Sequence, residues 1–450
     1  MWAYRLLRAF LQFAVRVFYR QREVVGLENI PAEGEGPVIF AGNHPNSLID
    51  PVLLVATCGR IVRFAAKDTL FDSFLLRPFL RALGAVPIRR RMDHAGDNVD
   101  NSAAFDALFA VLGEGRAIGI FPEGISHDEA QLARLKTGAA RIALGTRARH
   151  PDAPLKIVPC GLTYIHPKHF RSRVLVQYGP PIEVPSASPD DAEAVRALTE
   201  ELDKGLRGLT INASDWDTLR ILDGVRRLYQ PPRIPLAHRV ELARRFALVY
   251  EQVRGEPAIA AAFERVKRYL ERLEDGGFTD RDLTRPFRPV RTFVQVVREL
   301  VWFCLWLPLA APGVVLHAPL GILIGLGGKL LTPRKDVLAT TKLALGIFLV
   351  VLAYAAIVGV TVWQLGLLAG AAAVVLLPLT GYATVAVLER TSSLRRIFTR
   401  LARAFVLGEE RKALLAERAE LEALVVAAVD RYRPPEMELL YPRAAEERKA

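Results

Sequence analysis

The feature that most constrains this chain is an apolar stretch at 343–388, which contains no formally charged side chain over 46 residues. A helix needs about 20 apolar residues to cross the hydrocarbon core of a bilayer. The stretch is therefore long enough for two membrane-spanning helices, which we predict at 343–363 and 366–388, with a turn near Gly366. A chain with such a stretch is predicted to be a multi-pass membrane protein.

A second apolar stretch, at 300–328, is interrupted by Pro308, Pro312 and Pro319. Because proline kinks a helix, this segment is predicted to be either one kinked span or a hairpin that enters and leaves on the same side. Basic residues flank the 343–388 stretch on both sides, and its turn carries none. The positive-inside tendency puts both flanks in the cytoplasm, which favours the hairpin over three full spans.

The composition agrees with attachment to a membrane. Hydrophobic residues make up 51% of the chain, and the formal net charge is +12. Such a charge fits nucleic acid, anionic lipid or acidic substrates, and the apolar segments favour the lipid surface. Aromatic residues do not interleave with basic ones as they do in nucleic-acid platforms, so we predict the phospholipid bilayer as a partner and no nucleic acid. Cys58, Cys160 and Cys304 lie far apart, which argues against a disulfide framework or a structural zinc site.

Arginines recur at helical spacing within residues 1–20, where Arg5, Arg8, Arg16 and Arg20 form one polar stripe. Apolar side chains cover the rest of this segment. We predict a basic amphipathic helix that lies at the membrane interface. The alternative is an ordinary surface helix packed on the following domain. A cleavable signal is not predicted, because the arginines would interrupt its apolar region.

From residue 21 to residue 205, apolar strand-like runs alternate with helical stretches. The predicted strands are 37–41, 61–65, 85–88, 117–121, 156–159 and 173–178, and the predicted helices are 51–57, 102–112 and 136–146. Such alternation is typical of an α/β fold, a mostly parallel sheet flanked by helices. The other predicted divisions are a helical region at 206–295, a membrane region at 296–392 with C-terminal transmembrane helices, and a cytoplasmic helical tail at 393–450.

A histidine and a carboxylate, His44 and Asp50, follow the first predicted strand of the α/β domain. An imidazole in a loop can remove the proton of an attacking hydroxyl, while a carboxylate partner fixes its tautomer and stabilises the imidazolium. Many such pairs only form hydrogen bonds within a loop. The pair therefore gains its significance from the motifs that follow it.

Three further motifs come at the ends of later strands. Three arginines at 89–91 follow the strand residues 84–88 directly. The planar guanidinium group of arginine suits a phosphate. A solvated basic turn is the alternative for these arginines. Residues 121–124 read Phe-Pro-Glu-Gly and leave a strand for a loop, and residues 157–159 close another strand with a proline that can shape a pocket wall.

Together these residues resemble the PlsC-like glycerophospholipid acyltransferases. The ordered motifs of that family are a His–Asp pair, a Gly-rich strand ending in Arg, a Phe-Pro-Glu-Gly block and an apolar strand with proline. All four occur here in that order between residues 41 and 161. The resemblance implies a glycerolipid acyltransferase-like α/β domain in which His44 and Asp50 are the catalytic pair. It also implies that Arg90, with Arg89 one register away, binds the phosphate of the acceptor.

The resemblance assigns the remaining motif residues in the same way. Glu123 and Gly124 match the block that binds the acceptor. Val158 and Pro159 match the block on the acyl-donor side. No cofactor and no metal are expected, because the acyl donor, acyl-CoA or acyl-carrier protein, is a co-substrate.

Two departures from the family pattern are present. Five residues separate His44 from Asp50, an HX5D motif, where most of the family has four. The residues after Phe-Pro-Glu-Gly are Ile-Ser-His at 125–127, where Thr-Arg-Ser is usual. Both variants are similar to the fungal-type glycerol-3-phosphate and dihydroxyacetone-phosphate acyltransferase subgroup. Because the usual arginine is missing, acceptor binding is expected to depend more on the arginines at 89–91 and on Lys136, together with Ser126.

The function implied by the resemblance is transfer of a fatty acyl group from the donor to a hydroxyl of glycerol 3-phosphate or 1-acylglycerol 3-phosphate in phospholipid biosynthesis. Alternative acceptors are dihydroxyacetone phosphate and another lysophospholipid. A further alternative is a non-catalytic lipid-binding membrane protein. The catalytic domain is expected at the cytoplasmic face of the membrane, which is the inner membrane if the chain is bacterial.

Overall fold

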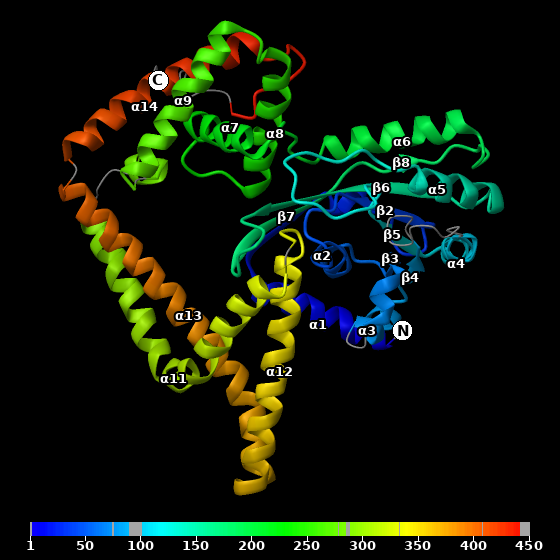
Figure 1. Cartoon of the computed structure of the whole chain (residues 1–450), viewed down its shortest axis with the longest axis horizontal. Coiled ribbons are helices and arrows are strands. Elements are labelled where there is room, and N and C mark those ends of the chain that lie inside the picture. The colour runs from blue at the N-terminus through cyan, green and yellow to red at the C-terminus, as the bar shows by residue number, and fades with distance from the viewer. Residues whose placement is uncertain are drawn as a thin grey trace.

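The computed structural model describes residues 2–73, 76–89, 101–277, 279–284, 289–332, 334–406 and 408–441. Figure 1 shows an α/β unit beside a cluster of helices, and long helices that extend away from both. The N-terminal half of the chain forms the α/β unit. The helical cluster combines segments from the middle of the chain, in green, with a segment near its C-terminus, in red.

A sheet forms the centre of the α/β unit. Its strands are β1 (Tyr19–Val25), β2 (Val38–Gly42), β3 (Val62–Lys67), β4 (Val86–Ile88), β5 (Ala117–Ile120), β6 (Lys156–Ile165), β7 (Ser172–Tyr178) and β8 (Ile182–Glu183). Their order is β1-β7-β6-β2-β5-β3-β4, with β8 paired to β6. The pairs β6–β7 and β6–β8 are antiparallel, and the other pairs are parallel. The predicted α/β fold, with a mostly parallel sheet, is confirmed.

Helices cover both faces of this sheet. They are α1 (Trp2–Phe18), α2 (Ile49–Thr57), α3 (Leu76–Ala82), α4 (Ser102–Gly113), α5 (Gly138–Arg149) and α6 (Ala192–Arg207), with short 3-10 turns at Leu27–Asn29 and Asp68–Asp72. Alternate residues of β2 point to opposite faces. Ile39 and Ala41 pack in the core under α4, α5 and α6, whereas Val38 and Phe40 pack in the core under α1 and α2. A parallel sheet buried on both faces explains why its strands read as continuous apolar runs.

Helix α1 carries apolar side chains on two faces. Leu11, Val15 and Phe18 are buried against the α/β unit, whereas Trp2 and Leu6 are 78% and 66% exposed. The helix therefore packs on the domain, as the alternative prediction has it. It also presents outward the apolar side chains that an interfacial helix needs. The two predictions for residues 1–20 are compatible with each other.

Two strands differ from the sequence prediction. β1 is not predicted, because Tyr-Arg-Gln-Arg-Glu-Val-Val is polar; it lies at the edge of the sheet, pairs with β7 and leaves polar side chains in solvent. β6 is predicted only at 156–159 but continues to Ile165, because residues 160–165 pair with β7. This extension carries side chains of β6 to the level of the loop that follows β2.

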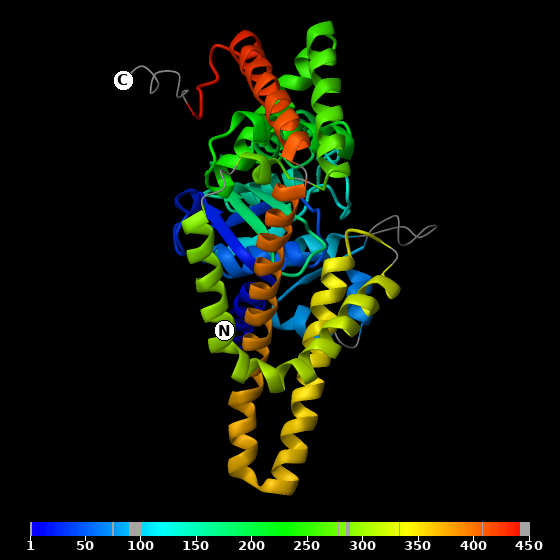
Figure 2. The same cartoon turned by 90° about the vertical axis from the view of Figure 1, so that its left-hand side faces the viewer.

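Among the described residues, three helices are long and apolar enough to cross a membrane, namely α11 (Pro289–Leu330), α12 (Leu338–Leu365) and α13 (Leu367–Val406). The turn between α12 and α13 falls at Gly366, which has a left-handed φ of 86°. Helix α11 continues through Pro308, Pro312 and Pro319 without a break. Figure 2 shows that α11 bends sharply, so that both of its ends lie above the bend, while α12 and α13 form a longer hairpin that extends further down. Residues 300–328 thus belong to one bent helix, and the choice between a kinked span and a membrane hairpin stays a prediction.

The helical cluster consists of α7 (Trp216–Tyr229), α8 (Leu236–Val253), α9 (Pro257–Asp275), α10 (Asp280–Thr284) and α14 (Gly408–Tyr432). Leu414 and Leu421 of α14 are fully buried in one core with Ile221 of α7 and Val266 of α9. The predicted tail at 393–450 is therefore not a separate unit in the described part. Its first residues continue α13, and α14 returns to complete the helical cluster (Figure 1).

Gly119→Ala is expected to destabilise the α/β unit, because a Cβ at this position of β5 would lie 2.2 Å from the ring of Phe64. Overpacking a filled core costs about 1–3 kcal/mol. Thermal unfolding of the purified protein in detergent measures this loss as a lower melting temperature. Gly138→Ala is the matched control, since a Cβ there meets nothing within 4 Å. Equal melting temperatures for the two variants would contradict the account of this core.

Candidate active site

His44 and Asp50 meet as a hydrogen-bonded pair at the carboxyl end of β2, with His44 Nδ1 2.8 Å from Asp50 Oδ2. β2 ends at Gly42 and α2 begins at Ile49, so Asp50 lies in the first turn of α2. Ser47 adopts a left-handed conformation, with a φ of 47°. This uncommon conformation turns the loop tightly enough to accommodate five intervening residues. The two side chains therefore stay within hydrogen-bond distance despite the longer spacing.

The Asp50 carboxylate is fully buried, and hydrogen-bond donors surround it. Its Oδ2 atom also accepts the Asn46 N–H at 2.8 Å, and its Oδ1 atom accepts the Tyr164 hydroxyl. Burial raises the pKa of Asp50, and the hydrogen bonds from His44, Tyr164 and Asn46 oppose that shift. Because Nδ1 is bound to the carboxylate, His44 Nε2 is the ring nitrogen available to a substrate proton.

Several contacts fix the position of the His44 imidazole. The ring stacks on Phe121 with 4.0 Å between centroids and 9° between planes, and Phe121 lies 5.8 Å from the ring of Phe64. The His44 N–H donates to Glu123 Oε1 at 2.7 Å, and the His44 carbonyl accepts the His127 N–H at 3.2 Å. The loop after β5 thus holds the histidine through its ring and through both sides of its backbone.

Glu123 is a second buried carboxylate, and both of its oxygens face protein groups. Oε1 accepts the His44 N–H, while Oε2 accepts the Ala133 N–H at 2.8 Å and pairs with His127 Nε2. The hydrogen bond that His127 donates to Glu123 raises the pKa of His127 against the opposing effect of burial. Glu123 is expected from the resemblance to bind the acceptor. Its contacts join the loop after β5 to the loop after β2 (residues 43–48), the candidate catalytic loop, and the acceptor-binding role stays a prediction.

Lys136 lies over Gly124 in the loop after β5. Gly124 has a left-handed φ of 74°, and a Cβ there would lie 2.7 Å from Lys136 Nζ. The Lys136 N–H donates to the Pro122 carbonyl at 2.8 Å. Its side chain is exposed and has no carboxylate partner within the described ranges. The fold therefore brings together two of the predicted acceptor-binding residues and leaves a cation available to an anion.

Arg89 follows β4 at the same edge of the sheet as His44. The strands β2, β5, β3 and β4 are parallel neighbours, so their carboxyl ends share one edge. Arg89 Nε lies 3.8 Å from Asp68 Oδ2, and 53% of its side chain is exposed. Arg90, the other arginine predicted to bind phosphate, lies outside the described residues.

Val158 and Pro159 are buried within β6, beside the middle of β2. Immediately after them, the Cys160 carbonyl accepts the Asn43 N–H at 3.3 Å. The Asn43 side chain also forms two hydrogen bonds with the backbone of Leu162, at 2.7 and 3.1 Å. This part of β6 supports the catalytic loop from behind. The acyl-donor role expected for Val158 and Pro159 remains a prediction.

Residues between α11 and α12 complete the site, and no sequence motif predicts them. The Ser126 hydroxyl donates to Asp336 Oδ2 at 2.6 Å, across 210 positions of sequence. Arg334 Nη2 donates to the Ser126 carbonyl at 3.0 Å and to Asp336 Oδ2 at 2.7 Å. The Asp336 side chain is buried, whereas 61% of the Arg334 side chain is exposed. A guanidinium group therefore lies beside the block from which the usual arginine is missing.

The first turn of α12 packs directly on the catalytic loop. Thr340 Oγ1 donates to the Asn46 carbonyl at 3.4 Å, and Lys342 Nζ donates to the Lys168 carbonyl at 2.9 Å. Ala339 is fully buried in the core shared with α1 and α2. The start of a helix that is long enough to cross a membrane is thus part of the wall around His44.

Comparisons with known proteins agree with this geometry. A family described as Acyltransferase matches residues 21–163, and a family described as Glycerol-3-phosphate acyltransferase 2 C-terminal domain matches residues 221–326. The first of these ranges contains all four motifs. Residues 21–163 therefore match an acyltransferase family, and the predicted resemblance to the glycerophospholipid acyltransferases is confirmed.

Individual relatives narrow this resemblance. The chain is 34% identical over 274 residues to Glycerol-3-phosphate O-acyltransferase 1 of Saccharomyces cerevisiae, covering 55% of this chain and 36% of the relative. It is 34% identical over 280 residues to Glycerol-3-phosphate O-acyltransferase 2 of the same yeast, covering 57% and 38%. The chain thus spans little more than a third of the length of these two relatives. Within the family it is similar to the fungal-type subgroup, as the variant motifs predict.

A shorter and more distant relative points to the same family. The chain is 32% identical over 124 residues to 1-acyl-sn-glycerol-3-phosphate acyltransferase of Borreliella burgdorferi, covering 27% of this chain and 46% of that protein. Among solved structures, the 1-acyl-sn-glycerophosphate acyltransferase PlsC from Thermotoga maritima has 21% identity and a TM-score of 0.34, over 46% of this chain and 79% of that one.

Tyr164→Phe is expected to lower kcat about tenfold and to move the acid limb of the pH–rate profile to higher pH. The Tyr164 hydroxyl stabilises the charged form of Asp50 and so opposes the effect of burial on its pKa. Without that hydroxyl, the pKa of this carboxyl rises further. Below that pKa, a neutral Asp50 no longer stabilises a protonated His44. Steady-state rates across a pH series measure the shift. Tyr178→Phe, whose hydroxyl bonds Thr57 instead, is the control, and an unshifted profile for Tyr164→Phe would contradict the assignment.

Proposed function

We propose that this chain is a membrane-bound O-acyltransferase that transfers a fatty acyl group from an acyl thioester to a hydroxyl of glycerol 3-phosphate or 1-acylglycerol 3-phosphate. The observation that carries the proposal is the His44–Asp50 pair, joined at 2.8 Å within an acyltransferase domain. The names of the yeast and Borreliella relatives support these two acceptors. Because the chain spans only part of those relatives, we assign their activity to it as a proposal.

In the proposed reaction, His44 Nε2 removes the proton of the acceptor hydroxyl as its oxygen attacks the thioester carbonyl carbon. A new C–O bond forms, the C–S bond breaks, and the thiolate leaves with the proton returned from the imidazolium. Asp50 stabilises that imidazolium and keeps Nδ1 protonated. Backbone amides stabilise the oxyanion of the intermediate. The step needs acyl-CoA or acyl-carrier protein as co-substrate, and it needs no cofactor, metal or acyl-enzyme.

The acceptor phosphate is proposed to bind beside the loop after β5. Lys136 and Arg334 present exposed cations there, and the Ser126 hydroxyl lies 3.2 Å from Arg334 Nη2. An arginine fork and a lysine point charge are the groups that bind phosphate well. Arg89, at the same edge of the sheet, is a further candidate. Glu123 is proposed to act indirectly, by holding the backbone of His44.

The position of the membrane helices supports a lipid substrate or product. Helix α12 begins on the catalytic loop, so an acceptor that already carries one acyl chain can present its head group to His44 while its chain stays near the bilayer. The basic flanks of 343–388 support a cytoplasmic position for the catalytic domain. The bilayer is therefore a proposed partner as well as an anchor.

An acceptor panel tests the proposal. Purified full-length protein with a labelled acyl donor is expected to acylate glycerol 3-phosphate or 1-acylglycerol 3-phosphate, and His44→Ala is expected to lower kcat/KM by about 10²–10⁴-fold. Faster transfer to dihydroxyacetone phosphate or to another lysophospholipid would replace the proposed acceptor. Binding without transfer to any of them would indicate a lipid-binding protein, and undiminished transfer by His44→Ala would contradict the mechanism.

Arg334→Gln is expected to raise the KM for the phosphorylated acceptor about tenfold, because one charge-assisted bond to the phosphate is lost. The KM for the acyl donor is expected to stay the same. Lys335→Gln removes the same charge from the next residue of this loop and serves as the matched control. An equal change in acceptor KM for the two variants would show that loop charge, and not the position of Arg334, matters.

A further inference from the structure

A large cleft lies between the edge of the sheet and the helical cluster, with a volume of about 2380 Å³. Its lining includes Asn43 and Pro45, the two neighbours of His44. From there the cleft follows β6 and β7 to walls formed by α7, α8, α11, α13 and α14. It therefore connects the surroundings of the catalytic histidine with a part of the protein that no catalytic motif includes.

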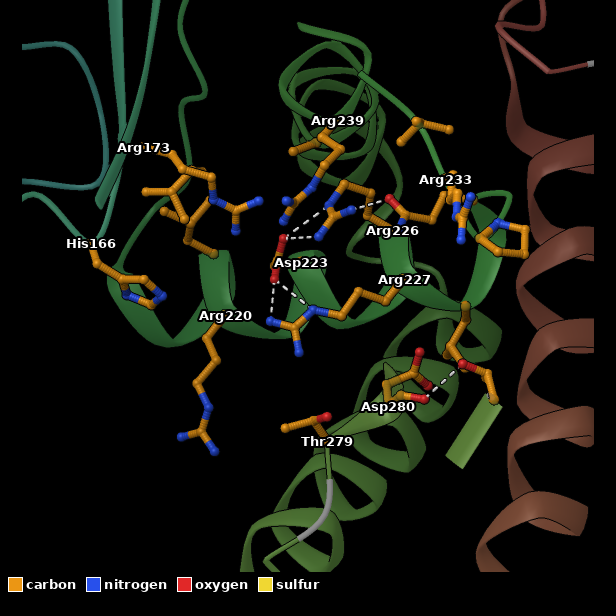
Figure 3. A pocket seen from close by; sticks show the side chains of 18 of the residues that line it. His166, Arg173, Arg220, Asp223, Arg226, Arg227, Arg233, Arg239, Thr279 and Asp280 are labelled. Atoms are coloured by element: carbon orange, nitrogen blue, oxygen red, sulfur yellow. Dashed lines mark hydrogen bonds and ion pairs between the residues drawn. The ribbon is translucent and has the colours of Figure 1, made fainter. Parts of the chain in front are cut away.

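The cleft is strongly basic. Among the described residues, twelve arginines and six carboxylates line it, and no lysine does. Figure 3 shows part of this lining, where arginines from β7, α7 and α8 gather around one carboxylate. The labelled arginines are Arg173, Arg220, Arg226, Arg227, Arg233 and Arg239. A concave surface with this excess of guanidinium groups concentrates anions.

One carboxylate, Asp223, accepts hydrogen bonds from two of these arginines. Arg226 Nε donates to Asp223 Oδ1 at 2.9 Å, and Arg227 Nε donates to Asp223 Oδ2 at 2.8 Å. Figure 3 shows the Arg173 and Arg239 side chains turned toward the same carboxylate. Four positive groups therefore meet around one negative group, and the local charge stays positive.

Arg239 shows that this excess is not neutralised within the protein. Its Nε atom is buried without a hydrogen-bond partner, and no carboxylate in the described ranges pairs with it. Burial, followed by repulsion from Arg226 and Arg173, lowers the pKa of Arg239 to about 10. A buried Nε–H without an acceptor is costly unless an anion binds it, and Asp223 opposes only part of the repulsion from the neighbouring arginines. The arrangement suits a ligand that brings several negative charges.

We propose that this arginine-lined cleft binds the phosphorylated nucleotide end of acyl-CoA, whose thioester arm then reaches along the cleft to His44. The inference rests on the proposed acyl transfer and names its donor. Coenzyme A carries several phosphate groups at one end and the thioester at the other. The cleft is lined both by guanidinium groups and by the neighbours of His44, so it offers contacts to both parts of such a molecule. The acceptor phosphate has its own cations, Lys136 and Arg334.

The recessed position of the arginines favours binding of a nucleotide over binding of a carrier protein or a lipid head group. Arg239 is half-buried within this concave lining, where the convex surface of a folded carrier protein reaches poorly. A lipid head group with one phosphate offers fewer charges than the cluster can bind. A small, flexible polyanion enters such a cleft and meets several guanidinium groups at once.

Calorimetric titration of CoA into the full-length protein, in nanodiscs of uncharged lipid, tests the proposal without turnover. Arg239→Gln is expected to weaken CoA binding about tenfold, and Arg239→Lys to weaken it less. Dephospho-CoA is expected to bind wild-type protein more weakly than CoA does. Arg254→Gln is the control, because Arg254 is exposed on α8 outside the cleft. Arg233→Gln, an exposed position of the cleft, gives a second variant that leaves the core intact.

Unchanged CoA affinity in both Arg239→Gln and Arg233→Gln would overturn the proposal. If nanodiscs with phosphatidate bind or activate the wild-type protein but not these variants, while CoA affinity stays the same, the cleft is a lipid site. Efficient use of acyl-carrier protein without CoA binding would also overturn it. The titration contains no acceptor, so its result does not depend on acyl transfer. Loss of CoA binding in the variants therefore supports a CoA site in the cleft even if the wild-type protein transfers no acyl group to glycerol 3-phosphate.

Discussion

The structure around His44 depends on the buried carboxylate of Asp50. Removing a charged group from water costs several kcal/mol unless other groups compensate it. Here the Asn46 N–H, the Tyr164 hydroxyl and the His44 ring share its two oxygens. These donors come from the loop after β2 and from β6, while the carboxylate itself comes from α2. Keeping the charge buried therefore requires that strand, loop and helix stand in one arrangement, and that arrangement leaves His44 Nε2 as the ring nitrogen that can accept a proton.

A second buried carboxylate extends this arrangement to the next strand, and a membrane helix completes it. Glu123 ties the loop after β5 to the backbone of His44, and Phe121 stacks on its ring. The first turn of α12 then packs on the same loop, where Thr340 bonds to Asn46. The site around His44 is thus built partly from the segment that connects α11 and α12, two helices that are long and apolar enough to cross a membrane. The position of α12 and the geometry of the loop after β2 are coupled through these direct contacts.

Much of the fold and part of the site follow from the sequence, because local patterns carry them. Apolar runs predict the parallel strands, and parallel strands bring their carboxyl ends, and so His44, Arg89 and Phe121, to one edge. Tyr164 is not predicted, because β6 is extended by its partner β7 and no motif marks that extension. Arg334 and Asp336 are not predicted, since they reach Ser126 across about 210 positions of sequence. Motifs also do not reveal packing. The contacts of Glu123 with backbone N–H groups and the burial of Val158 and Pro159 depend on it. The return of α14 to α7 and α9 depends on it as well.

The central claim is that His44 and Asp50 act as one catalytic unit, and a double-mutant cycle on kcat/KM tests it most directly. His44→Ala, Asp50→Asn and the double variant are compared with wild-type protein in the same acyl-transfer assay. Groups that act as a unit have non-additive effects, so the account predicts that the double variant loses no more activity than His44→Ala alone. If the two losses instead multiply in the double variant, Asp50 acts independently of His44, and the account is contradicted.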